Sequence, residues 1–262
     1  MLFSASLAKV EGPVSVLQIS PDWAQGRATF GGLIAAQVYQ AMNCLVKPDR
    51  PVRSLHITFA APVVPDEISV AAKIVRDGKA VTVTEGHCIQ EGELKVLLSG
   101  SFGSMRQSEI VAPPLPMPDI PDREEGKLLR YVAGLTPEFI QHFHYNFLFG
   151  GLPFSNTKSR EMGGWVKFAD PEPEITIGHL LALIDAWPPA TLPWLSKPAA
   201  ASTLTWNIQF LQPLPTLSGS AEYLYHALIE EAADGYAFTH ARLWNEEGQL
   251  LALSQQTVAV FG

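Results

Sequence analysis

Cysteine, long apolar runs and a leader segment are scarce in this sequence, and each shortage excludes a class of protein. The chain contains only Cys44 and Cys88, which make no disulfide framework and are expected to be free thiols in a reducing compartment. Its longest apolar runs are far too short to span a bilayer, and its first residues lack the basic start and apolar core of a signal peptide. We therefore expect a soluble, cytoplasmic protein with no membrane partner.

Positive charge and familiar catalytic motifs are scarce as well. The formal net charge of −8 argues against nucleic acid as a partner, because nucleic acid needs a basic face. There is no Gly-x-Ser-x-Gly serine-hydrolase elbow and no glycine-rich nucleotide fingerprint after a strand. His142 and His144 offer two metal ligands with no evident third, so we expect no metal site. The hydrophobic content of 47% is ample for a sizeable core.

The sequence does contain one internal duplication. An apolar run with a glycine near its start occurs at residues 29–43 and again at 176–189, and alternating segments follow at 52–66 and 202–216. A long alternating region then comes in each copy, broken by an Asp-Gly turn and by a second turn with Gly after Glu. Such pairs between alternating runs predict hairpins, because glycine takes positive φ without steric cost. The order helix, strand, strand, turn, strand, turn, strand thus occurs twice.

This order predicts an α+β fold, a tandem (double) hotdog in which each copy is an antiparallel sheet wrapped around one central buried helix. Both apolar runs are apolar almost all round, which is typical of a buried helix. Residues 113–121 are too rich in proline for a regular element. We therefore expect an N-terminal hotdog at 1–110, a proline-rich linker and connecting segment at 111–135, and a C-terminal hotdog at 136–262. Within the connecting segment, residues 127–135 are predicted as a short helix.

Asp185 is the most informative single residue. It interrupts the apolar run at 180–187, and an ionised carboxylate is rarely buried because the loss of hydration costs several kcal/mol. One reading is a structural carboxylate that ends the helix before Pro188 and Pro189. The other is a carboxylate that orients or deprotonates water in a dry pocket.

Polar residues on three strands are the other candidates. Alternation places Thr203, Thr205, Asn207 and Gln209 on one face of their strand, and His56 on the matching polar face in the first copy. Each could simply face solvent. Gln255 and Gln256 are adjacent in the last strand, so one of them must point inward, where a buried amide needs partners.

Taken together, the segments at 29–42, 54–62, 183–189, 203–213 and 254–260 resemble, in order and spacing, the acyl-CoA thioesterase II family of double-hotdog enzymes. The resemblance covers nearly the whole chain. It implies that the catalytic residues are Asp185, Thr203 and Gln256, which together hold the attacking water. It also matches the Phe-Gly-Gly segment of the family to residues 30–32 and a family histidine to His56.

The function expected from this resemblance is hydrolysis of acyl-CoA to a free fatty acid and coenzyme A, with no cofactor, since coenzyme A is part of the substrate. Gly31, Gly32, His56 and Arg53 are the expected substrate-binding residues, and Arg53 belongs to a basic group that could hold the phosphates of coenzyme A. That group is Arg27, Lys47, Arg50 and Arg53. Two other functions stay open, a hotdog hydratase or dehydratase on acyl thioesters and a catalytically silent acyl-CoA-binding protein. Exposed sheet edges also predict a homo-oligomer, a dimer or larger.

Overall fold

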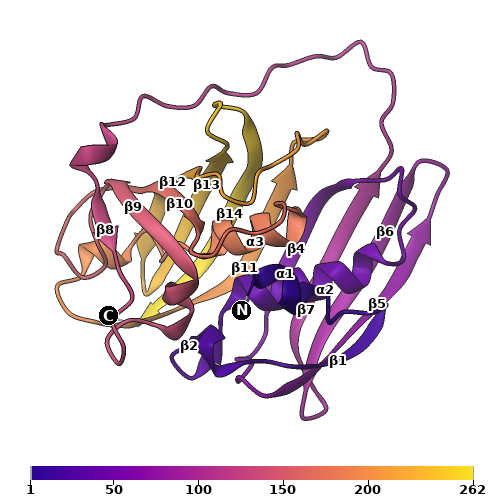
Figure 1. The fold of residues 1–262 in the computed structure, drawn as a ribbon, viewed down its shortest axis with the longest axis horizontal. Coiled ribbons are helices and arrows are strands. Elements are labelled where there is room, and N and C mark those ends of the chain that lie inside the picture. The colour runs from indigo at the N-terminus through magenta and orange to yellow at the C-terminus, as the bar shows by residue number, and fades with distance from the viewer. Residues whose placement is uncertain (1, 262) are drawn as a thin grey trace.

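The computed structural model describes residues 2–261 and consists of one long antiparallel sheet, a separate two-stranded sheet and few helices (Figure 1). The helices are α1 (Phe3–Leu7), α2 (Gly31–Asn43) and α3 (Ile177–Asp185), with 3₁₀ helices η1 (Pro21–Trp23), η2 (Arg123–Glu125), η3 (Glu138–His142) and η4 (Leu192–Trp194). The strands before the linker are β1 (Val14–Gln18), β2 (Ala24–Gln25), β3 (Ala28–Thr29), β4 (Val52–Phe59), β5 (Glu67–Asp77), β6 (Val81–Gln90) and β7 (Glu93–Gly103). Those after it are β8 (Lys127–Leu129), β9 (Phe143–Phe149), β10 (Glu161–Phe168), β11 (Ala200–Phe210), β12 (Tyr223–Ala233), β13 (Tyr236–Trp244) and β14 (Leu250–Phe261).

The 12-stranded sheet divides into two halves that follow the duplication. Its order is β1-β5-β6-β7-β4 for the first half and β11-β14-β13-β12-β10-β9-β8 for the second. The halves join where β4 pairs with β11, with His56 opposite Asn207 at the centre of the register. Joining these two edges hides them from solvent, which removes two of the exposed edges that a separate pair of sheets would have.

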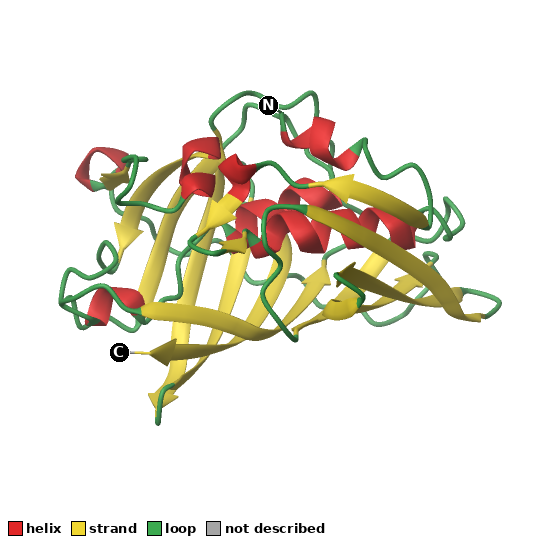
Figure 2. Ribbon diagram, turned by 90° about the horizontal axis from the view of Figure 1, so that it is seen from below, coloured by secondary structure: helices red, strands yellow, loops and turns green. Residues whose placement is uncertain are grey.

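The two long helices lie side by side on the concave face of the sheet, as Figure 2 shows. Helix α2 packs on β5, β6 and β7 and also contacts α3. Nearly every residue of both helices is buried, from Gly32 to Met42 and from Gly178 to Ile184 with few exceptions. This agrees with their sequences, because a helix that is apolar all round must be covered on all sides.

The segment between the halves differs in part from the expectation. Residues 104–122 contain no helix or strand and run along one side of the molecule, from β7 to η2 (Figure 1). The predicted short helix at 127–135 is wrong, because Lys127–Leu129 form β8 and pair with β9. Strand β10 was not expected from the sequence. No helix within residues 2–261 has the length and apolarity needed to cross a membrane.

Candidate active site

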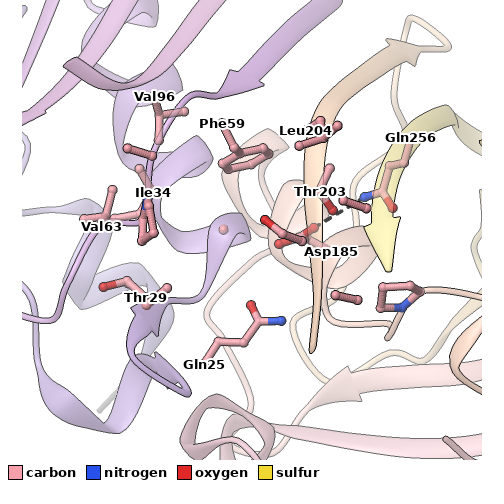
Figure 3. Close-up of a pocket in the computed structure, with 18 of the residues that line it drawn as sticks. Gln25, Thr29, Ile34, Phe59, Val63, Val96, Asp185, Thr203, Leu204 and Gln256 are labelled. Atoms are coloured by element: carbon pink, nitrogen blue, oxygen red, sulfur yellow. Dashed lines mark hydrogen bonds between the residues drawn. The ribbon is translucent and has the colours of Figure 1, made fainter. Parts of the chain in front are cut away.

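A cavity of about 300 Å³ lies where the two halves meet, and Figure 3 shows the side chains around it. It is lined from the first half by the β2–β3 hairpin, the start of α2 and the end of β4, and from the second half by the end of α3, the start of β11 and β14. Among its lining residues the only ionisable side chain is that of Asp185. Of the residues expected at the site, Gly31, Thr203 and Gln256 also line it.

Asp185 is the last residue of α3, and its carboxylate faces the first turn of α2. Burial raises the pKa of the Asp185 carboxyl from 3.8 to about 7. Hydrogen bonds from the backbone N–H of Gly32 and from the side chain of Gln256 oppose this rise but are outweighed. The half-buried carboxylate therefore changes its protonation state near neutral pH. The free N–H groups and the dipole of α2 add a favourable potential for its charged form.

Two glycines let α2 come this close. A Cβ atom at Gly31 would lie 3.0 Å from Oδ2 of Asp185 and 3.2 Å from the Phe59 ring. A Cβ atom at Gly32 would lie 2.6 Å from the Phe30 ring and 3.1 Å from the Cα atom of Ala182. The expected Gly-Gly pair thus serves the packing of the two helices and keeps a side chain out of the space beside the carboxylate.

A β-bulge brings Thr203 into the cavity. In the ladder between β11 and β14, Thr203 stands opposite Val258 and Thr205 opposite Thr257, so Leu204 is an extra residue. Opposed residues share a face of the sheet, and Val258 is fully buried on the inner face. The prediction that Thr203 shares the polar face of Thr205 is therefore wrong, because the bulge reverses the alternation at this point.

The two adjacent glutamines of β14 face opposite sides of the sheet. Nε2 of Gln256 donates a hydrogen bond of 3.5 Å to Oδ1 of Asp185, whereas Gln255 is exposed on the outer face. Next to them, Ser254 is buried and accepts a hydrogen bond of 2.9 Å from Nε1 of Trp206. Trp206 is fully buried and stands opposite Gln256 in the ladder, so the inward residue is Gln256.

Aromatic side chains form the wall behind Asp185 in the second half. Trp187, which lines the cavity, stacks on Tyr225 with ring centroids 5.2 Å apart and meets Tyr145 edge-on at 5.8 Å. The hydroxyl of Tyr145 donates to the carbonyl oxygen of Ala186 at 3.1 Å, which holds the backbone directly after Asp185. Burial, with the nearby Asp185 charge as a smaller cause, raises the pKa of Tyr145 far above its usual range, so this phenol stays neutral.

Several lining residues were not singled out from the sequence. Gln25 and Thr29 come from the β2–β3 hairpin, and Ile34, Phe59 and Trp187 are apolar residues that the sequence assigns to the general core. The hairpin does have a sequence signal, because Gly26 is a turn residue between two short stretches that contain polar residues, and this could have indicated a β-turn. The apolar residues carry no such signal, because cavity walls and core use the same residue types.

His56 and Arg53 do not join the cavity. His56 is exposed on the outer face of the sheet, where its Nδ1 contacts Oδ1 of Asn207 at 2.5 Å. The guanidinium of Arg53 donates from Nε to the carbonyl oxygen of Gly103 at 3.0 Å. Within residues 2–261, no three His, Cys, Asp or Glu side chains lie close enough together to hold a metal ion.

Two family models match the chain and together cover most of it. One describes the N-terminal domain of acyl-CoA thioesterases and matches residues 19–103, and the other describes the C-terminal domain and matches residues 113–260. A search of curated protein sequences gives no significant match. Both halves of the chain therefore match the same kind of enzyme, in the order in which that enzyme carries them.

Solved structures show the same fold at low sequence identity. A protein of unknown function with a hotdog fold from Alicyclobacillus acidocaldarius has a TM-score of 0.83 and 24% identity, over 99% of this chain and 98% of that chain. The tesB protein of Mycobacterium avium subs paratuberculosis has a TM-score of 0.78 and 17% identity over 100% of both chains. For the acyl-CoA thioesterase II TesB2 of Mycobacterium marinum the values are 0.73 and 19%, over 98% and 97%. With hotdog neighbours over its full length and two matching domain models, the chain belongs to the acyl-CoA thioesterase family.

Proposed function

We propose that this protein hydrolyses acyl-CoA to a fatty acid and coenzyme A, with Asp185, Thr203 and Gln256 holding the attacking water. One observation carries the proposal. Asp185 is the only ionisable residue that lines the cavity, and burial raises its pKa to about 7. A carboxylate that titrates near neutral pH accepts a proton from water far better than an ordinary surface Asp does.

The reaction follows from the positions of these groups. Asp185 removes a proton from the water while its oxygen attacks the thioester carbonyl carbon, and Thr203 and Gln256 hold that water in place. Negative charge develops on the carbonyl oxygen, and the positive end of the α2 dipole beside Gly31 and Gly32 stabilises it. The C–S bond then breaks, the proton passes from Asp185 to the departing sulfur, and the products are a carboxylic acid and a thiol.

The two alternative functions find less support in this geometry. A hydratase needs a second acid–base group beside the carboxylate, and His56 lies on the opposite face of the sheet. A silent acyl-binding protein gains nothing from a carboxylate whose burial is unfavourable and whose place an apolar residue could take. The duplication in the sequence and the junction of the two halves at β4 and β11 favour two tandem hotdogs, at 1–110 and 136–262, that share one site.

The expected homo-oligomer stays a prediction. Strands β1 and β8 end the sheet, and the β1 edge carries the exposed side chains of Val14 and Val16. An apolar edge of this kind is typically covered by another chain. Assembly is not needed to complete the proposed site, because every residue assigned to it comes from one chain.

The test is release of free thiol from a panel of acyl-CoA thioesters, by the parent protein and by Asp185→Asn. The variant keeps the shape of the side chain and removes the base, so kcat should fall by roughly 10²–10⁴-fold. An enoyl-CoA in the same panel separates the hydratase reading, since hydration removes its absorbance without releasing thiol. Parent protein that releases no thiol from any thioester would overturn the proposal, as would an Asp185→Asn variant that hydrolyses at the parent rate.

A further inference from the structure

The geometry points to a phosphate-binding site for the acyl carrier at the β2–β3 hairpin, where Arg27 contacts phosphate and Gln25 contacts the pantetheine arm. The inference rests on the proposed function for the identity of the ligand. Coenzyme A joins an anionic, phosphate-bearing end to the thioester through a neutral arm that contains amides. The protein therefore needs a cation outside the site of hydrolysis.

The cavity itself cannot hold the phosphates. Its lining includes no Lys, Arg or His, and its one charge is the Asp185 carboxylate, which repels anions. Its buried apolar residues are Ile34, Val63 and Val96 from the first half and Trp187 and Ala259 from the second, and they suit the acyl chain. The carrier must therefore leave through the part of the lining that is exposed, which consists of Gln25, Ala60, Pro62, Ser202 and Phe261.

Gln25 is the one long polar side chain among these exposed lining residues. Figure 3 shows it reaching toward the cavity from the hairpin, with its carboxamide on the side of Asp185. A carboxamide both donates and accepts hydrogen bonds, so it matches the amide groups of a pantetheine arm. This places the exit of the carrier along the β2–β3 hairpin.

Arg27 lies at the tip of this hairpin, beside the exit. Strand β2 pairs with β3 through Ala24 opposite Thr29 and Gln25 opposite Ala28, so Gly26 and Arg27 form the turn, and Gly26 has a φ of +64°. The base of the hairpin is fixed, because the N–H of Thr29 donates to the carbonyl oxygen of Val63 at 2.6 Å. An exposed arginine on a fixed turn presents a planar pair of donors that suits a phosphate.

The other cations of the basic group expected from the sequence are already engaged. Lys47 and Arg50 both pair with Asp77, and Arg53 donates to a backbone carbonyl. Arg27, in contrast, makes no ion pair or side-chain hydrogen bond with any of residues 2–261. Its charge is free for a ligand, and its neighbours Gln25 and Ala28 line the cavity.

The test compares thioesters of one acyl group on coenzyme A and on pantetheine, which has no phosphate. We expect Arg27→Gln to raise KM for the acyl-CoA by about tenfold, because the variant loses one exposed charge-assisted contact with the substrate. We expect kcat to stay unchanged. With the acyl-pantetheine, the variant and the parent should give equal rates. Arg76→Gln is the matched control, because it removes one exposed positive charge from a residue that does not line the cavity.

Calorimetric binding of free coenzyme A provides an arm that does not depend on hydrolysis. Weaker binding of coenzyme A by Arg27→Gln supports the site even if the proposed reaction fails. An acyl-4′-phosphopantetheine separates the sources: an Arg27 effect with it as well assigns the contact to the phosphate that carrier proteins share, and an effect with acyl-CoA alone assigns it to the nucleotide. Equal KM values for parent and Arg27→Gln with acyl-CoA would overturn the inference. So would an equal loss with acyl-pantetheine.

Discussion

Helices α2 and α3 each carry a glycine in their first turn, Gly31 and Gly178, but the two glycines have opposite surroundings. At the start of α2, Gly31 opens onto the cavity and faces the carboxylate of Asp185. At the start of α3, a Cβ atom on Gly178 would lie 2.7 Å from Cδ1 of Leu7 and 3.6 Å from Cβ of Ala36. The second helix start is therefore covered by α1, and neither Gly178 nor its neighbour His179 lines the cavity at the start of α2.

Side chains lock the second helix start in this covered state. Nδ1 of His179 accepts the N–H of Thr176 at 3.2 Å, and its Nε2 lies 3.4 Å from Oε2 of Glu172. The same buried Glu172 carboxylate accepts the backbone N–H groups of Phe3 and Ser4, at 2.6 and 3.1 Å, and so holds α1 in place. Burial lowers the pKa of His179, and Glu172 opposes this shift. The hydrogen bonds of these two side chains hold the starts of α1 and α3, so we assign them a structural role.

The duplication also differs at the position of the acid. Thr176 and Asp185 are nine residues apart (185 − 176), and the same step from Thr29 leads to Val38 (29 + 9). Val38 is fully buried, so the first copy has an apolar core residue where the second has the carboxylate. The comparison teaches that a duplicated fold offers two helix starts and two acid positions, and we propose that this chain uses one of each at a single site.

The substitution of glycine by alanine in each helix is the sharpest test of this comparison. Gly31→Ala places a methyl group 3.0 Å from the Asp185 carboxylate, which must shift, and a shift of this kind costs about 10–100-fold in kcat. Gly178→Ala meets only the flexible end of Leu7 and the side chain of Ala36, so kcat should stay within about threefold. Steady-state kinetics on one acyl-CoA, with circular dichroism to confirm folding, measures both. Equal losses in the two variants would show that the two helix starts are equivalent, contrary to our assignment.

A smaller loss is expected for Thr203 and Gln256, the residues that we propose to position the water. Thr203→Val and Gln256→Ala should each lower kcat by about tenfold, and the double variant should lose well under a hundredfold because the two act on one water. Thr205→Val and Gln255→Ala are matched controls, since the bulge and the register place these neighbours on the outer face. If Thr205→Val slows the reaction as much as Thr203→Val does, the bulge does not select the catalytic threonine.

Much of the fold was predictable because hydrophobic periodicity determines which elements form. Both buried helices, the hairpins after them and the end of α3 at Asp185 follow from apolar runs, turn residues and Pro188-Pro189. Strand β10 was not predictable, because Gly163 and Gly164 weaken strand propensity. Their role becomes visible only in the sheet, where a Cβ atom at Gly163 would lie 2.1 Å from the carbonyl oxygen of Tyr225.

The site was predictable in its residue types and only partly in its geometry. Asp185 stands out because a carboxylate interrupts an apolar helix, and the pair Gln255-Gln256 requires one inward glutamine. Simple alternation, however, places Thr203 outward, and only the extra residue Leu204 turns it inward. His56 shows the reverse case, because resemblance suggested a binding role while the pleat of β4 places it on the outer face.

The smallest effect we expect concerns stability, and it tests whether Asp185 belongs to the site or to the framework. Its pKa is about 7 in the folded protein against 3.8 for an ordinary Asp, so between these values the folded state binds more protons than the unfolded state. The free energy of unfolding therefore falls as pH rises from about 4 to about 7. Asp185→Asn carries no titrating group and lacks this slope. The difference would be at most about 4 kcal/mol for the full shift, and because the Asp185 side chain is only half-buried we expect about 1 kcal/mol. Urea unfolding at pH 5 and pH 8 measures it: the gain in stability of the variant over the parent should be larger at pH 8.

If Asp185 instead ends the helix as a structural carboxylate, the variant loses about 1 kcal/mol at pH 8. In that case the first helix start, like the second, would face a residue that is there for packing, and the contrast between the two halves would lose its functional meaning.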